Sequence, residues 1–350
     1  MMKTIAALAA LAACACASAQ SAVSVFGTVD MYVGHAKSGA YSSTRQDSGG
    51  NSASRLGFRG TEDLGGGWSA RFVLEGGLDT DTGTGNGGSA FSFMRQSSLG
   101  LSGPWGALDM GRMYTPMFQA VARADAFALN TVFSPMNLAA MVDAQPGLRS
   151  FAPRASNMLR YRTPLGQGLF TDLAYAPGEA GALSQRSGDL YSGSLGWSRQ
   201  PWYVAYAFQR AYSGSAAVPV ADPEKSTYQS LSAAYRGPQW QFFGTLARNE
   251  VNRPGVGAAQ LVSLGAAWNA TLQSRLAVAV VQRKVSHSAR SQRAWTLGYD
   301  YALSKRTALY SRWLHLDNGA NASASLAQIP VAANSGNSAS LIAVGVRHNF

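Results

Sequence analysis

Short segments in which apolar and polar residues alternate occur along most of the chain. Near the beginning, every second residue is apolar, as at Val23, Val25, Val29, Met31 and Val33. The residues between them include the polar Ser24, Thr28 and Asp30. The final segment alternates in the same way, with Ile342, Val344, Val346, His348 and Phe350 opposed to Ala343, Gly345, Arg347 and Asn349. A period of two predicts β-strands whose two faces meet different surroundings.

Turn sequences rich in Gly, Pro, Asn and Ser divide these segments at a regular interval. They centre on Gly65, Pro104, Gly166, Gln200, Gly237, Ala270 and Ser304, so the successive intervals are 39, 62, 34, 37, 33 and 34 residues. An interval near 35 residues holds two strands of about ten residues and one longer loop, which is the unit of a transmembrane β-barrel. Seven turns join fourteen strands, and the first and last strands make sixteen. The sequence therefore predicts an all-β fold, a 16-stranded antiparallel transmembrane β-barrel.

Aromatic residues near the proposed turns favour a membrane barrel over a soluble sandwich, which would alternate as well. They are Trp68, Trp197, Trp202, Trp240, Trp268, Tyr301 and Tyr310. These are the positions expected for an aromatic girdle at a membrane interface. The 62-residue interval is the exception, because residues 114–153 exceed an ordinary hairpin. Loops of that length are usually functional, and we expect this third loop to fold inward and narrow the lumen.

Composition and charge limit the possible functions further. A hydrophobic content of 46%, a mean hydropathy of −0.06 and 38 glycines suit many short strands and turns, not a helical membrane protein. The formal net charge is +11, with 24 Arg and 5 Lys. Because the basic residues are dispersed and the chain begins with an export signal, we expect small anions, and no nucleic acid, as partners.

Residues 1–19 have the pattern of a secretory signal peptide, which leaves residues 20–350 as the barrel. Lys3 supplies the positive charge, an apolar run from Ile5 to Ala13 follows, and Ala17-Ser18-Ala19 forms a small-residue cleavage site. A rival interpretation remains open, because Leu11-Ala12-Ala13-Cys14 also resembles a lipoprotein processing site that would leave an acylated Cys14. Under the first interpretation Cys14 and Cys16 are removed, so no disulfide is expected.

Several segments together resemble the trimeric general porins of Gram-negative bacteria, particularly their anion-selective β-proteobacterial branch. The similarity extends over nearly the whole mature chain and is carried by residues 54–67, 95–103, 111–116, 297–307 and 345–350. It implies an outer-membrane homotrimer, a third loop folded into the pore, and a terminal Phe350 read by the barrel-assembly machinery. The implied function is a water-filled channel for passive diffusion of small hydrophilic solutes. A substrate-specific channel for organic or inorganic anions is the alternative.

The resemblance also implies a pore constriction. By motif match, Arg55, Arg95 and Arg154 occupy the basic positions, and Glu75 and Asp125 the acidic ones. The region from Ala126 to Phe151 departs most from the family pattern.

The alternation of inward-facing and outward-facing residues along a strand predicts that Arg55 and Arg154 point into the lumen. Arg95 shares parity with Leu99 and Leu101, so it points inward only if a bulge intervenes or if Ser98 and Gly100 face a close neighbour. The small residues Ser98, Gly100 and Ser102 on one strand face are therefore a candidate contact between subunits.

Catalysis, metal binding and cofactor binding find no support in the sequence. The four histidines are His35, His287, His315 and His348. None lies in a recognisable nucleophile–base motif. Asp79 and Asp81 begin a pattern like a calcium loop, but its twelfth position is Ala90 where Glu is needed. We therefore expect no enzyme, no metal and no cofactor.

The first prediction concerns processing. Signal peptidase should cleave after Ala19, because Ala17 and Ala19 are small residues at the positions that the enzyme reads. Intact-mass measurement of the outer-membrane form should show Gln20, or its cyclised form, at the N-terminus. An acylated Cys14 at the N-terminus would contradict both the cleavage site and the absence of cysteine.

Overall fold

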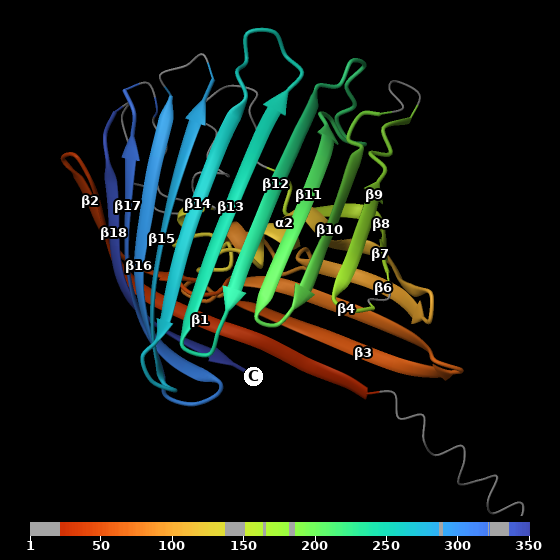
Figure 1. The fold of residues 1–350 in the computed structure, drawn as a ribbon, viewed down its shortest axis with the longest axis horizontal. Coiled ribbons are helices and arrows are strands. Elements are labelled where there is room, and N and C mark those ends of the chain that lie inside the picture. The colour runs from red at the N-terminus through yellow and green to blue at the C-terminus, as the bar shows by residue number, and fades with distance from the viewer. Residues whose placement is uncertain are drawn as a thin grey trace, which may run out of the picture.

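A single antiparallel sheet, closed on itself, makes up the molecule (Figure 1). The computed structural model describes residues 22–136, 151–163, 166–181, 186–286, 290–320, 322 and 336–350. The proposed signal peptide lies outside these residues. The strands are β1 (Ala22–Ser38), β2 (Tyr41–Ser48), β3 (Arg55–Gly65), β4 (Trp68–Asp79), β5 (Thr84–Gly85), β6 (Gln96–Gly103), β7 (Gly106–Tyr114), β8 (Arg154–Arg162), β9 (Leu169–Ala176), β10 (Leu190–Arg199), β11 (Trp202–Tyr212), β12 (Lys225–Arg236), β13 (Trp240–Val251), β14 (Ala259–Asn269), β15 (Ser274–Val285), β16 (Ser291–Ala302), β17 (Thr307–Asn318) and β18 (Ala339–Asn349).

The ring has sixteen strand positions, which confirms the predicted fold. β2 and β3 occupy one position, because both pair with the same side of β1. β5 is a two-residue strand that pairs with β4 alone and lies outside the ring. All other neighbours in the ring are consecutive in sequence, and β1 pairs with β18 to close it. The seven predicted short turns join the strands as expected, although residues 164 and 165 of the third lie outside the described part.

The alternation predicted from the sequence separates an outer apolar face from an inner polar one. In β1, Val25 and Val33 are 56% and 51% exposed, whereas Thr28 and Asp30 are buried. In β18, Ile342 and Val344 are likewise exposed on the outer face. A band of exposed Val, Leu and Phe side chains around a barrel is what a hydrocarbon environment stabilises.

The expected aromatic girdle is largely confirmed, with one correction. Trp68, Trp202 and Trp240 are exposed near the short turns, and Trp240 stacks on Trp268 with ring centroids 5.8 Å apart. Tyr310, however, is 3% exposed, and its hydroxyl donates a hydrogen bond to the Asp30 carboxylate at 2.5 Å. The strand pairing places it on the inner face opposite Gly345, where its ring needs the space that a glycine leaves.

The long third loop contacts the inner face of the barrel wall. Helix α2 (Pro116–Ala122) begins directly after β7 and lies within the ring of strands, next to β10 and β11 (Figure 1). The Tyr203 hydroxyl donates to the Ala120 carbonyl, and the Thr296 hydroxyl donates to the Phe133 carbonyl. Residues 137–150 of this loop lie outside the described part. None of the described helices is long and apolar enough to cross a membrane.

The seam between the first and last strands ends at the C-terminal residue. Gly27 and Phe350 exchange two backbone hydrogen bonds of 3.1 Å each. The Phe350 ring occupies the position that a Cβ on Gly27 would take, and it remains 45% exposed on the outer face. Phe350 therefore forms the last hydrogen-bonded pair between the first and last strands, and its ring covers that pair.

Candidate functional site

Charged side chains from three elements meet on the inner wall where the third loop begins. Arg95 donates from Nε to Oε1 of Glu75 at 2.6 Å, and both residues are buried. Arg95 also donates from a terminal nitrogen to the Tyr114 hydroxyl at 2.7 Å, and Arg154 donates to the same hydroxyl at 2.8 Å. The Arg154 guanidinium lies 4.3 Å from the centroid of the Tyr114 ring. Tyr114 thus joins two of the three arginines named from the sequence.

Arg95 faces the lumen because it precedes the regular part of its strand. The ladder between β4 and β6 begins with Glu75 opposite Gln96, and Arg95 lies in a bend one residue earlier. Because of this bend Arg95 does not follow the alternation of β6, and no bulge interrupts the pairing of β4 with β6. Ser98 is paired with the inward-facing Val73, so the small residues of β6 point into the lumen. The expected subunit contact through that small-residue face is therefore wrong.

A one-residue shift in pairing also affects Arg154. Between Gly111 and Met113 the register of β7 against β8 slips, and Asn157 takes a φ of 56°. Because of this shift, Arg154 does not continue the alternation that leads back from Arg160, so the parity from which its inward direction is predicted is wrong. Arg154 reaches the cluster through its pairing with Tyr114.

Arg55 follows an inward loop of residues 49–54 that separates β2 from β3. The Asp30 carboxylate holds this loop by accepting backbone hydrogen bonds from Asn51 at 3.0 Å and Ser52 at 2.7 Å. Arg55 lies opposite the buried Thr28, which confirms its inward parity, and it donates to the Ser52 hydroxyl at 3.1 Å. Nothing in the sequence pattern marked Asp30 as the anchor of this loop.

Gly77 leaves space for the Arg95 side chain beside the strand position of Arg55. The two residues Gly77 and Arg55 are directly opposed in the pairing of β3 with β4. A Cβ on Gly77 would lie 3.2 Å from Cδ of Arg95 and would overlap the side-chain oxygen of Asn86. A larger residue at position 77 would displace the side chain of Asn86 and press against that of Arg95.

The structure brings together four of the five predicted constriction residues and places Asp125 apart from them. Oδ2 of Asp125 accepts hydrogen bonds of 2.6 Å from the Leu129 amide and from the Ser134 hydroxyl. Burial raises the pKa of the Asp125 carboxyl, and these hydrogen bonds oppose the rise only in part. Asp125 shapes its own loop and forms no hydrogen bond with the three arginines.

The charge of this group is unbalanced. Glu75 compensates Arg95, whereas no ion pair with a carboxylate is described for Arg55 or Arg154. Within the part of the chain that the structure describes, their guanidinium groups donate hydrogen bonds to neutral oxygens, those of Ser52 and Tyr114 respectively. An arginine remains protonated at any working pH and presents a planar fork to carboxylate, phosphate or sulfate. The arrangement can therefore attract anions to the lumen, and it has no nucleophile–base pair.

Comparisons with known proteins agree with this architecture. The model of the Gram-negative porin family matches residues 6–321. The chain is 32% identical to outer membrane porin protein 32 of Delftia acidovorans, with 100% of both chains covered. The anion-selective porin from Comamonas acidovorans superposes with a TM-score of 0.85 at 28% identity, covering 95% of this chain and 100% of that one. The trimer form of OmpT from Vibrio cholerae shares the fold, with a TM-score of 0.69 at 14% identity and coverage of 94% and 99%.

The family match covers most of the chain, the full-length relative is a porin, and the closed sheet has the sixteen strand positions of such a barrel. The chain belongs to the Gram-negative porin family and is a passive channel protein of the outer membrane.

Proposed function

We propose that the channel is anion-selective and that Arg55, Arg95 and Arg154 set the selectivity. The observation that carries the proposal is that Arg55 and Arg154 have no carboxylate partner among the described residues, beside the neutralised Arg95–Glu75 pair. Two excess positive charges on the wall raise the local concentration of anions and lower that of cations. The described part of the third loop, from Thr115 to Met136, supports a constriction at this level because it occupies space inside the ring.

Selectivity of this kind requires no catalysis and no dedicated binding pocket. An ion must be attracted enough to enter and weakly enough to leave, and partly hydrated arginines meet both conditions. The alternative, a channel specific for one organic or inorganic anion, predicts currents that saturate with the concentration of that anion. A linear dependence of current on concentration across a panel of anions would favour general diffusion.

We also propose that the barrel assembles as a homotrimer through the outer face of β3 and β4. Phe58 and Phe72 lie on this face, and a segment carrying Phe91, Phe93 and Met94 covers it. The Phe58 and Phe93 rings meet edge to face at 6.2 Å, yet Phe91 and Met94 remain 42% and 41% exposed. Exposed aromatic and methionine side chains are enriched in the centres of protein interfaces.

The trimer is tested by placing polar groups on that face. Phe91→Gln with Met94→Gln should weaken the trimer, because amide groups would be buried without partners. Light scattering in mild detergent and gel mobility before and after heating would report the change. Leu246→Gln with Leu264→Gln is the matched control, since both leucines are exposed on the outer face elsewhere. Equal stability of the two double variants, or a monomeric wild type, would refute the assignment.

We propose that the signal peptide of residues 1–19 directs export of the chain. We also propose that the barrel-assembly machinery then recognises Phe350. Deleting Phe350 removes two backbone hydrogen bonds and the ring over Gly27. We expect lower outer-membrane levels of the deletion variant in cells. Refolding of the deletion variant into detergent measures how much the seam contributes to folding when the assembly machinery is absent. Normal cellular levels would exclude the signalling role, and an equal loss in both assays would assign the effect to the seam alone.

Reversal potentials in a salt gradient test the selectivity. Arg55→Ser with Arg154→Ser should lower the anion-to-cation permeability ratio, most visibly at low salt, because exposed charges are screened over about 8 Å at physiological ionic strength. Each arginine should contribute about 0.5–1 kcal/mol, and about 1.4 kcal/mol corresponds to a tenfold preference. An unchanged ratio would place the selectivity elsewhere, and a cation-selective wild type would refute the proposal.

A further inference from the structure

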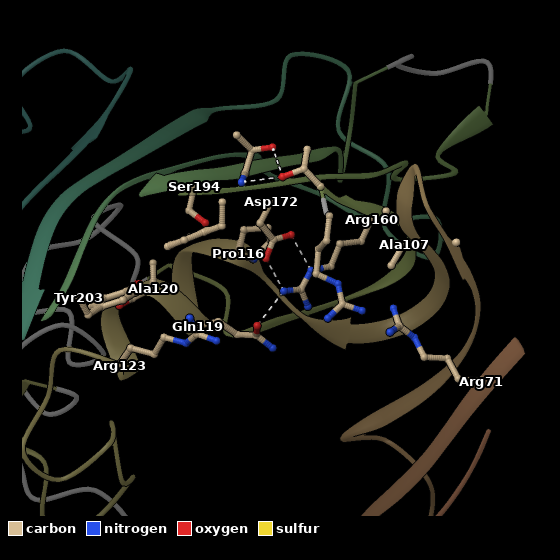
Figure 2. A pocket seen from close by; sticks show the side chains of 16 residues that line it. Arg71, Ala107, Pro116, Gln119, Ala120, Arg123, Arg160, Asp172, Ser194 and Tyr203 are labelled. Carbon is tan, nitrogen blue, oxygen red and sulfur yellow. Dashed lines mark hydrogen bonds and ion pairs between the residues drawn. The ribbon is translucent and has the colours of Figure 1, made fainter. Parts of the chain in front are cut away.

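A second basic region lies below the constriction, toward the short turns. It lines a hollow of about 370 Å³ between helix α2 and the wall formed by β4 and β6 to β11. Figure 2 shows the guanidinium groups of Arg71 and Arg123 directed toward this hollow from opposite sides, with Gln119 and Arg160 between them. Arg71 precedes Glu75 on β4 by four residues, so the hollow is displaced from the constriction by about 13 Å along the strand.

The positive charge of this hollow exceeds its negative charge. Four guanidinium groups line it, those of Arg71, Arg123, Arg160 and Arg162. Arg160 is paired with the buried Asp172. Arg71 and Arg162 share the single carboxylate of Asp109, at 2.7 and 2.6 Å. Two carboxylates therefore face four arginines.

Arg123 contributes charge without a carboxylate partner among the described residues. Its guanidinium lies 6.0 Å and 5.6 Å from the ring centroids of Phe170 and Tyr203, which stack on each other. These cation–π contacts orient the side chain but leave its charge uncompensated. The Arg162 side chain is 38% exposed, and its Nε has no described hydrogen-bond partner.

We propose that this hollow is a second anion subsite, which retains small dianions such as dicarboxylates or inorganic phosphate between the constriction and the short-turn mouth. A dianion placed there contacts Arg123 on the helix side and Arg71 or Arg162 on the wall side. A monoanion can satisfy only one side, so the subsite discriminates by valence. The inference rests on the proposed anion conduction and adds a site, occupied in series with the constriction, where multivalent anions dwell longer than chloride.

Block of chloride current by succinate, at constant ionic strength in planar bilayers, tests the subsite. In the wild type, succinate should reduce the chloride current at lower concentration than acetate does. In Arg123→Gln with Arg162→Gln, the half-blocking concentration of succinate should rise about fivefold to tenfold, because two of the converging cations are gone. The difference between succinate and acetate should then nearly vanish. Asp109 keeps Arg71 as a partner in this variant, which favours normal folding.

Two further variants separate the possible failures. Arg210→Gln with Arg293→Gln removes the same charge from exposed positions on the outer face and should leave succinate block unchanged. Arg55→Gln should shift the reversal potential and keep the succinate block. Equal block in the wild type and in the Arg123 and Arg162 double variant would overturn the subsite while leaving anion selectivity intact. A cation-selective wild type would overturn the proposed function itself, whatever the block shows.

Discussion

The requirement that every backbone polar group be satisfied inside a membrane governs this structure. Hydrocarbon offers no hydrogen-bond partners, so a sheet can cross it only when the sheet has no edge. The seam between β1 and β18, from Thr28–Asn349 to Lys37–Ser340, removes the last edge and converts a row of hairpins into a barrel. The final residue completes this closure, because Phe350 exchanges its backbone hydrogen bonds with Gly27.

Closure determines where charge can lie. One face of each strand meets lipid, and charged groups in the middle of the strands, such as Arg71, Glu75 and Asp109, lie on the lumen face. There they form layers in which carboxylates offset only part of the arginine charge. Arg95 is neutralised by Glu75 and Arg160 by Asp172, whereas Asp109 serves both Arg71 and Arg162. Paired arginines stabilise the wall, and those without a carboxylate partner among the described residues are the ones that we propose permeating anions meet.

The third loop uses the interior that closure creates. Its apolar side chains, including Val121, Phe133 and Met136, are buried against inward-facing residues of β11 to β17. Its carbonyl groups accept hydrogen bonds from wall residues such as Tyr203, Thr296 and Arg275. The same loop holds α2 against β10 and β11 and supplies Arg123 to the hollow.

The sequence by itself determined the barrel, its sixteen strand positions, its short turns and the inward direction of Arg55. These features repeat with a fixed period, and each is local to a strand or a turn. The tertiary structure decided what depends on departures from that period. A bend turned Arg95 inward and a register shift brought Arg154 to Tyr114, while closure of the seam brought Asp30 of β1 to Tyr310 on the inner face of β17. Asp125 turned into its own loop, where the Leu129 amide and the Ser134 hydroxyl donate hydrogen bonds to its carboxylate. Such departures arise where segments distant in sequence come into contact, and a periodic pattern carries no information about those tertiary contacts.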